Sequence, residues 1–251
     1  MPPTIDILIR SYYRDVQWLV LAVASVQCFV SGYRDLIVVL PDTSVGRIDW
    51  PAVPILRDVV IRHCHDYEND YIGQQITKLY ADTYSDADVI LHLDSDHVFV
   101  EPCDLQHRLF EAGKLRMEFD SSERRPLVDG WRRCPSVFME RAVPLDITGS
   151  PPVAFRRHLY SEVRRFCEQT HGLSIQDYTS TMRSDQFSEF AVLRGYALLN
   201  EPGLYAWVDT STRSFIAECR TFWSRAQTPG SVMRELPESL WSMLPSTTSR
   251  V

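Results

Sequence analysis

The chain has 251 residues, 45% of them hydrophobic and 11% aromatic, which indicates a single folded domain over residues 1–251 and excludes a disordered protein. No window reaches the roughly eighteen consecutive apolar residues of a membrane-spanning helix, and residues 1–6 carry no Lys or Arg, unlike a signal peptide. The net charge of −7 argues against binding duplex nucleic acid, which relies on basic side chains. We therefore expect a soluble, cytoplasmic protein without a transmembrane segment.

The first hundred residues alternate between strand and helix signals. In chain order the sequence predicts a strand at 5–9, a helix at 15–30, a strand at 36–40, a short strand at 59–62, a helix at 72–84 and a strand at 88–93. Continuous apolar runs such as 36–40 are typical of strands that are covered on both faces. The order of elements is typical of a layered α/β sheet with mostly parallel strands.

Ligands of such sheets bind beyond the carboxyl ends of the strands. The polar residues that follow predicted strands are Arg10, Ser11, Tyr12, Asp42, Asp94, Ser95 and Asp96. We expect these residues at the same edge of the sheet, where they would form a binding site.

The triplet Asp94-Ser95-Asp96 is the sharpest signal for chemistry, because it ends the strongest buried-strand signal in the chain. Two carboxylates at one turn either cap the next segment or bind a cation. Hard oxygen ligands suit Mg²⁺ or Mn²⁺, and such a metal in turn binds a diphosphate. The six cysteines lack CxxC or other zinc spacing, so we expect free thiols.

Periodicity is weaker in the second half of the chain. The sequence predicts strands at 115–119 and 136–139, a helix within 152–169, a helix at 184–193 capped by Ser184, and a loosely held tail at 228–251. Residues 124–166 contain nine arginines and only four acidic residues. Such a basic segment in an acidic chain either lies on solvated surfaces or faces an anionic ligand.

These motifs together resemble the GT-A superfamily of nucleotide-sugar-dependent glycosyltransferases and its DxD motif, here Asp94-Ser95-Asp96. The stretches 76–80, 89–96, 98–100 and 104–105 are similar to the glycogenin and galactosyltransferase-like branch. The resemblance implies a Rossmann-like GT-A fold, a three-layer α/β/α sandwich, with a donor half at 5–105 and an acceptor half at 106–227. It also implies Mn²⁺ or Mg²⁺, a nucleoside diphosphate sugar, most simply a UDP-sugar, and a hydroxyl acceptor.

The resemblance assigns roles to individual residues. It makes Asp96 the direct metal ligand and Asp94 its partner at the metal, ribose or sugar. It places Arg10, Ser11 and Tyr12 at the nucleotide, Asp42 at the base, Lys78 beside the donor and Trp223 on the sugar. The last of these follows from 218–224, which resembles the Trp- and Ser-bearing closing loop of some GT-A toxins.

Residues 184–190 resemble two catalytic patterns at once. Asp185 and Gln186 resemble the Asp-Gln pair of retaining members, whereas Glu189 is a candidate carboxylate base for an inverting reaction. On a helix, Asp185 and Glu189 would share a face at spacing i and i+4. The stereochemical outcome is therefore left open.

The third metal ligand of many family members, a His or Asp near the carboxyl end, has no clear counterpart. Asp209 and Glu218 are the substitutes that we consider. Among the histidines His63, His65 and His97, the last is close to the DxD motif, but its side chain can equally point away across the turn.

Two other functions fit the same residues. Asp94-Ser95-Asp96-His97-Val98 also fits the nucleophile motif DxDx(T/V) of haloacid-dehalogenase-type phosphatases, in which the first Asp attacks phosphorus. That motif normally follows the first strand, whereas here several strands precede it. A non-catalytic nucleotide-sugar or glycan-binding module would need Asp96 but neither Asp185 nor Glu189. For a transferase, the acceptor is a glycan, a lipid-linked sugar or another hydroxyl compound, with an anionic acceptor, nucleic acid included, favoured by the arginines.

Overall fold

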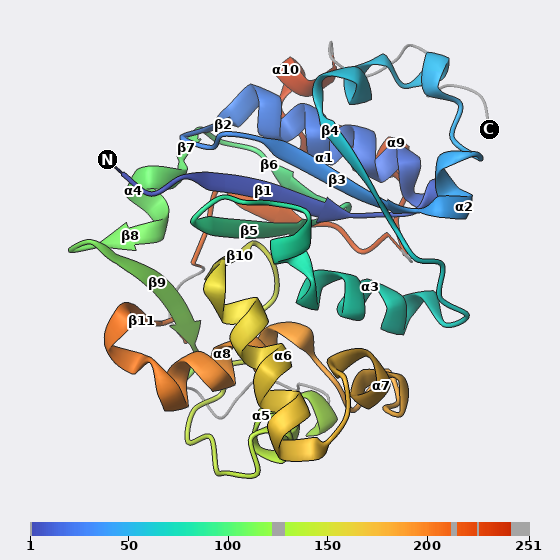
Figure 1. Cartoon of the computed structure of the whole chain (residues 1–251). Coiled ribbons are helices and arrows are strands. Elements are labelled where there is room, and N and C mark those ends of the chain that lie inside the picture. The colour runs from blue at the N-terminus through green and yellow to red at the C-terminus, as the bar shows by residue number, and fades with distance from the viewer. Residues whose placement is uncertain (1, 122–128, 212–214, 225, 242–251) are drawn as a thin grey trace.

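The computed structural model describes residues 2–121, 129–211, 215–224 and 226–241 (Figure 1). The strands are β1 Ile5–Arg10, β2 Val30–Ser31, β3 Leu36–Pro41, β4 Val60–Cys64, β5 Val89–Asp94, β6 His97–Phe99, β7 Cys103–Asp104, β8 Phe110–Glu111, β9 Lys114–Phe119, β10 Val153–Arg156, β11 Tyr205–Asp209 and β12 Cys219–Thr221. The α-helices are α1 Val16–Phe29, α2 Asp42–Val45, α3 Asp70–Leu79, α4 Leu105–Leu109, α5 Asp129–Phe138, α6 His158–His171, α7 Ile175–Ser180, α8 Glu189–Asn200, α9 Pro229–Val232 and α10 Glu238–Trp241.

The central sheet has five strands in the order β10-β5-β1-β3-β4. β5, β1, β3 and β4 are parallel, and β10 joins the edge of the sheet antiparallel to β5. The protein is therefore a mixed α/β structure with a mostly parallel central sheet, as the sequence predicts. In the register of the two inner strands, Arg10 lies opposite Asp94. The loop after β1 and the turn after β5 consequently leave the sheet side by side.

Helices lie on both sides of this sheet. In Figure 1, α1 lies on one side, and α3 and α6 lie on the other. β1 and β3 are buried along their whole length, which explains the continuous apolar run of β3. A smaller sheet, β11-β9-β8, extends from the second half of the chain, and β12 pairs with β6. In the part of the chain that the structure describes, no helix has both the length and the apolar character to cross a membrane.

The second half of the chain differs from its predicted elements in several places. The predicted strand at 136–139 is wrong, because these residues continue or follow α5. The helix predicted from Ser184 begins only at Glu189, with Ser188 as its cap accepting from the Ala191 amide. Edge strand β10 was not predicted, and it lies within the range 152–169 that we expected to contain a helix.

The carboxyl-terminal segment also differs from the loosely held tail that we expected. Val232, Leu236 and Leu240 are buried and pack in one cluster with Trp18 and Leu21 of α1. This segment thus belongs to the folded core up to residue 241. Residues 242–251 lie outside the described part of the chain.

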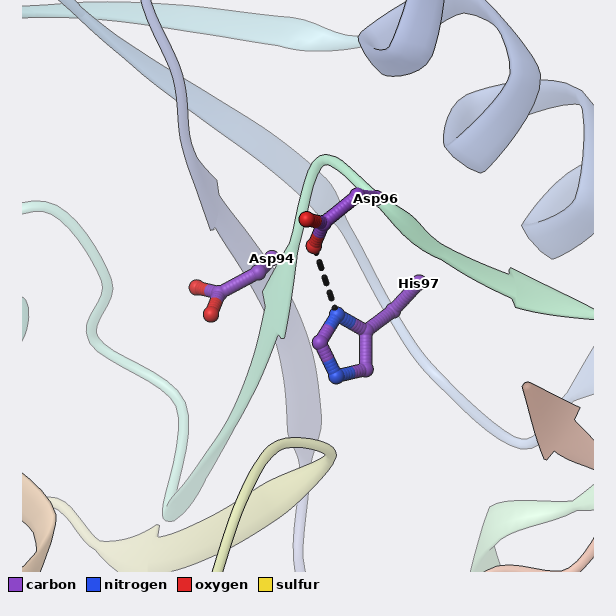
Figure 2. Close-up of side chains that lie close together, drawn as sticks. All are labelled: Asp94, Asp96 and His97. Carbon is purple, nitrogen blue, oxygen red and sulfur yellow. Dashed lines mark hydrogen bonds and ion pairs between the residues drawn. The ribbon is translucent and has the colours of Figure 1, made fainter. Parts of the chain in front are cut away.

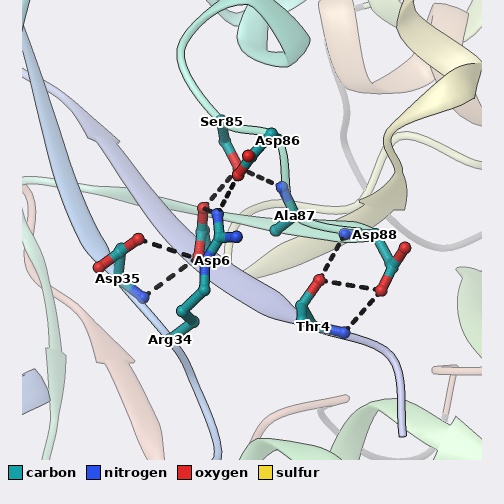
Figure 3. A network of polar contacts seen from close by, with 8 residues as sticks. All are labelled: Thr4, Asp6, Arg34, Asp35, Ser85, Asp86, Ala87 and Asp88. Carbon is teal, nitrogen blue, oxygen red and sulfur yellow. Dashed lines mark hydrogen bonds and ion pairs between the residues drawn. The ribbon is translucent and has the colours of Figure 1, made fainter. Parts of the chain in front are cut away.

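A polar network closes the amino-terminal end of the sheet (Figure 3). The Asp6 carboxylate, which is completely buried, accepts hydrogen bonds from Arg34 Nε at 3.0 Å, Arg34 Nη2 at 2.7 Å, the Asp35 amide at 3.1 Å and Ser85 Oγ at 2.6 Å. Arg34 also contacts the exposed Asp86. Because four donors surround Asp6, its burial costs little, and the network fixes β1 against β3 and the loop before β5.

Candidate metal and nucleotide site

The turn after β5 brings together two carboxylates and an imidazole. Asp94 ends β5, Ser95 and Asp96 form the turn, and His97 begins β6. One ligand atom from each of Asp94, Asp96 and His97 lies within 4.8 Å of the other two. Figure 2 shows the His97 ring turned toward Asp96, with its Nδ1 3.1 Å from Asp96 Oδ1. The carboxylate oxygens suit Mn²⁺ or Mg²⁺, and together with the imidazole they could hold a metal ion.

A distant segment of the chain holds Asp96 in place. Its carbonyl accepts from the Phe222 amide at 2.8 Å, and its Oδ2 accepts from the Ser224 amide at 3.3 Å. Burial alone would raise the pKa of Asp96, but the hydrogen bonds from His97 and Ser224 outweigh it and lower the pKa. Asp96 is therefore a carboxylate at neutral pH and is ready to bind a cation.

Lys78 lies beneath Asp94. Its Nζ is 2.8 Å from Asp94 Oδ1 and 3.1 Å from Glu189 Oε1, and only 4% of its side chain is exposed. Burial opposes ionisation of Asp94, yet the Lys78 ammonium outweighs it and lowers the pKa of Asp94. We expected Lys78 beside the donor; the structure instead buries it between two carboxylates.

Asp94 and Asp96 line a pocket of about 670 Å³ at the carboxyl edge of the sheet, whereas His97 is buried and is not among its described lining residues. Its described lining residues are Arg10, Ser11, Tyr12, Arg14, Asp15, Asp70, Tyr71, Gln74, Asp94, Ser95, Asp96, Trp131, Trp223 and Ser224. The predicted loop after β1, the Asp94–Asp96 turn and Trp223 thus meet in one place. Carboxylates outnumber guanidinium groups here, so a diphosphate would need a cation in order to bind.

Three lining side chains differ in what they offer a ligand. Arg10 is buried and already forms a bidentate ion pair with Asp70, with Nη1 3.0 Å from Oδ2. Ser11 Oγ is buried and has no hydrogen-bond partner among the described residues. Trp223 is 71% exposed. Ser11 and Trp223, rather than Arg10, are therefore the groups with unused binding capacity.

Several predicted site residues lie elsewhere. Asp42 is exposed and contacts His63 at 3.2 Å. Asp185 is exposed and paired with Arg183, while Gln186 lines a separate pocket of about 290 Å³ between α5 and α7. None of the three is among the described residues that line the pocket of the Asp94–Asp96 turn.

The expected pairing of Asp185 with Glu189 on one helix face is wrong. Residues 184–186 form a turn closed by the Gln186 amide bonding to the Arg183 carbonyl at 2.9 Å. A side chain on Gly130 would collide with the Asp185 carbonyl, 1.9 Å from an added Cβ. The close approach of α5 therefore keeps this turn out of α8.

Neither substitute for the third metal ligand reaches the site. Asp209 accepts from Ser121 Oγ at 2.5 Å and from the Ser211 amide at 3.0 Å on β11. Glu218 is ion-paired with Arg108. His97 instead joins the two aspartates. The signal in the sequence is that His97 directly follows Asp96. A new strand begins at His97, and the side chain of this first residue points back to the turn.

Comparison with models of known protein families found no match, and comparison with curated proteins found none either. What the site does must therefore be argued from its geometry.

The arginines of residues 124–166 are partly neutralised where they lie. Arg132 pairs with Asp146, Arg164 with Asp82, and Arg165 with Glu162. Arg124 and Arg125 lie outside the described residues. An anionic acceptor thus remains a prediction that depends on the other arginines of the segment.

The buried histidine His92, which lies below the site, should make the free energy of unfolding depend on pH. It is fully buried on β5, with Nε2 2.6 Å from the Tyr160 hydroxyl, and burial together with the nearby Lys78 charge lowers its pKa to about 3. An unfolded histidine takes up a proton near pH 6.5, whereas the folded one does so only near pH 3. As the pH falls from 6.5 to 3, the free energy of unfolding should therefore decrease by about 1.4 kcal/mol per pH unit on account of His92.

His92→Gln should remove this contribution. Urea unfolding at pH 7, 6, 5 and 4 measures the free energy of unfolding for both proteins, and the shared carboxylates cancel in the difference. We expect the difference between wild type and variant to change with pH at that slope. If the free energies of unfolding of wild type and variant change in parallel from pH 7 to 4, His92 is not buried in its neutral form.

Proposed function

We propose that the protein is a metal-dependent glycosyltransferase of the GT-A type, a Rossmann-like three-layer α/β/α sandwich, that transfers a sugar from a nucleoside diphosphate sugar to a hydroxyl acceptor. The observation that carries this proposal is the convergence of Asp94, Asp96 and His97 within 4.8 Å. They lie at the carboxyl edge of a mostly parallel sheet, and the two aspartates line a pocket of about 670 Å³. That edge is where such sheets bind nucleotides.

The proposed roles follow from what each side chain leaves available. Asp94, Asp96 and His97 would hold Mn²⁺ or Mg²⁺, which neutralises the charge of the leaving diphosphate when it is bound. Ser11 Oγ, buried without a partner among the described residues, would hydrogen-bond the nucleotide. The exposed Trp223 would offer a face on which the sugar stacks. Residues 5–105 then supply most of the donor site, and 222–224 close it from the acceptor half.

The geometry also bears on the phosphatase alternative. The strand that ends at Asp94, β5, follows three other strands of the same sheet along the chain, whereas the phosphatase motif normally follows the first strand. This position favours metal binding by Asp94 over covalent catalysis.

Donor turnover tests the proposal directly. Purified protein is incubated with UDP- and GDP-sugars in Mn²⁺, Mg²⁺ or EDTA, and release of the nucleoside diphosphate is followed. We expect turnover of at least one donor that requires the metal, because the carboxylate-lined pocket cannot accept a diphosphate without it. Metal-dependent phosphate release from p-nitrophenyl phosphate would support the phosphatase instead. Donor binding by calorimetry without turnover, across a panel of sugar acceptors, would support the binding module.

A further inference from the structure

The cluster of Lys78, Asp94 and Glu189 is not accounted for by the roles above. Glu189 opens α8 and is only 8% exposed at its side chain, and Lys78 lies near the end of α3. Lys78 Nζ also lies 4.8 Å from the centre of the Phe190 ring. Neither Lys78 nor Glu189 is among the described residues that line the 670 Å³ pocket. Both act, therefore, through Asp94 and not by touching a ligand in that pocket.

The charges in and beneath the turn are balanced for a divalent ion. Asp94, Asp96 and Glu189 carry three negative charges and Lys78 carries one positive charge, while a metal-binding His97 is neutral. The cluster thus keeps two net negative charges, which one Mn²⁺ or Mg²⁺ ion would cancel. Without Glu189, Lys78 would neutralise Asp94 fully and leave only one.

We infer that Glu189 is a positioning residue that sets the metal affinity of the site, because it shares the Lys78 ammonium and so leaves Asp94 able to bind a divalent cation. This inference rests on the proposed function only in that a divalent cation binds at Asp94 and Asp96. It replaces the role of catalytic base suggested by the sequence. A base must reach the acceptor hydroxyl, whereas Glu189 Oε1 is bonded to a buried ammonium.

Glu189→Gln tests the inference without changing the shape of the side chain. Mn²⁺ binding to the purified full chain, without any donor, is measured by calorimetry. Because partners behind a metal ligand typically change affinity by 10–100-fold, we expect the Mn²⁺ Kd to rise about tenfold or more. The matched control is Asp82→Asn, which removes a carboxylate that is ion-paired with Arg164 at the other end of β5 and should leave the Kd unchanged.

A second variant makes the test independent of folding defects. Lys78→Met combined with Glu189→Gln removes both charges and returns the cluster to two net negative charges. The double variant should therefore bind Mn²⁺ within about threefold of wild type, since contacting residues compensate non-additively. This recovery is expected only if the two side chains act as a charge pair on the metal site.

The outcomes separate the inference from the proposed function. If wild type binds Mn²⁺ and Glu189→Gln binds it equally well but has a much lower kcat at saturating Mn²⁺, Glu189 is a base and the inference is wrong. A double variant that binds Mn²⁺ no better than Glu189→Gln also overturns it. If wild type itself binds no Mn²⁺ and turns over no donor, the proposed function fails.

Discussion

Replacing Asp96 with asparagine is expected to lower metal-dependent donor turnover by roughly 10²–10³-fold, the effect of losing one preorganised electrostatic contact to the transition state. The amide keeps the shape of the side chain and can still accept from the Ser224 amide. It removes one of the two negative charges next to His97, however, and with it the stronger metal ligand. The measurement is nucleoside diphosphate release from a UDP-sugar over a range of Mn²⁺ concentrations.

Asp86→Asn is the control for this experiment. Asp86 is 83% exposed and contacts Arg34 at the amino-terminal end of the sheet, away from the Asp94–Asp96 turn. Its variant should turn over donor as wild type does. Full Mn²⁺-dependent turnover by Asp96→Asn would show that the metal site lies elsewhere.

Asp6→Asn should cause the largest loss of stability among the substitutions that we consider. Breaking a buried ion pair by removing one partner lowers the free energy of unfolding by about 3–5 kcal/mol. Because Arg34 is half-exposed, we expect a loss of about 3 kcal/mol for Asp6→Asn. The asparagine would also present an NH₂ group to donors that surround it on every side. For a chain of this size, the loss corresponds to roughly 6–12 °C in Tm. Guanidinium unfolding at pH 7 gives the free energy.

The same Asp86→Asn variant serves as the stability control. It removes an exposed partner of the same arginine, and such surface pairs contribute about 1 kcal/mol or less. A value for Asp6→Asn as small as that of Asp86→Asn would mean that the network in Figure 3 relaxes around the substitution.

The amino-terminal half of the fold follows from local signals in the sequence. The runs that became β1, β3 and β5 are mostly apolar because both faces of the sheet are covered. Their polar ends could be assigned to one edge, and Arg10 and Asp94 are indeed neighbours there. Both aspartates of the candidate metal site were identified in this way.

The rest of the site depends on tertiary contacts that no local pattern reports. Ser184 and Ser188 are equally plausible caps by residue type, but the structure uses Ser188, whereas 184–186 form a turn that packs against Gly130. Lys78 and Glu189 lie more than a hundred residues apart in the chain, so their ion pair could not be read from spacing. The orientation of His97 depends on the pairing of β6 with β12, which is equally non-local.

The hydrogen bonds from Phe222 and Ser224 to Asp96 have a consequence for biosynthesis. They join residues as far as 128 positions apart, so the parallel sheet can assemble while the turn after β5 still lacks its partners. During translation, the metal-ligating geometry would be completed only after the segment leading to α9 has left the ribosome. A nascent chain would therefore form the sheet first and gain the hydrogen bonds that hold Asp96 only after residues 222–224 have emerged.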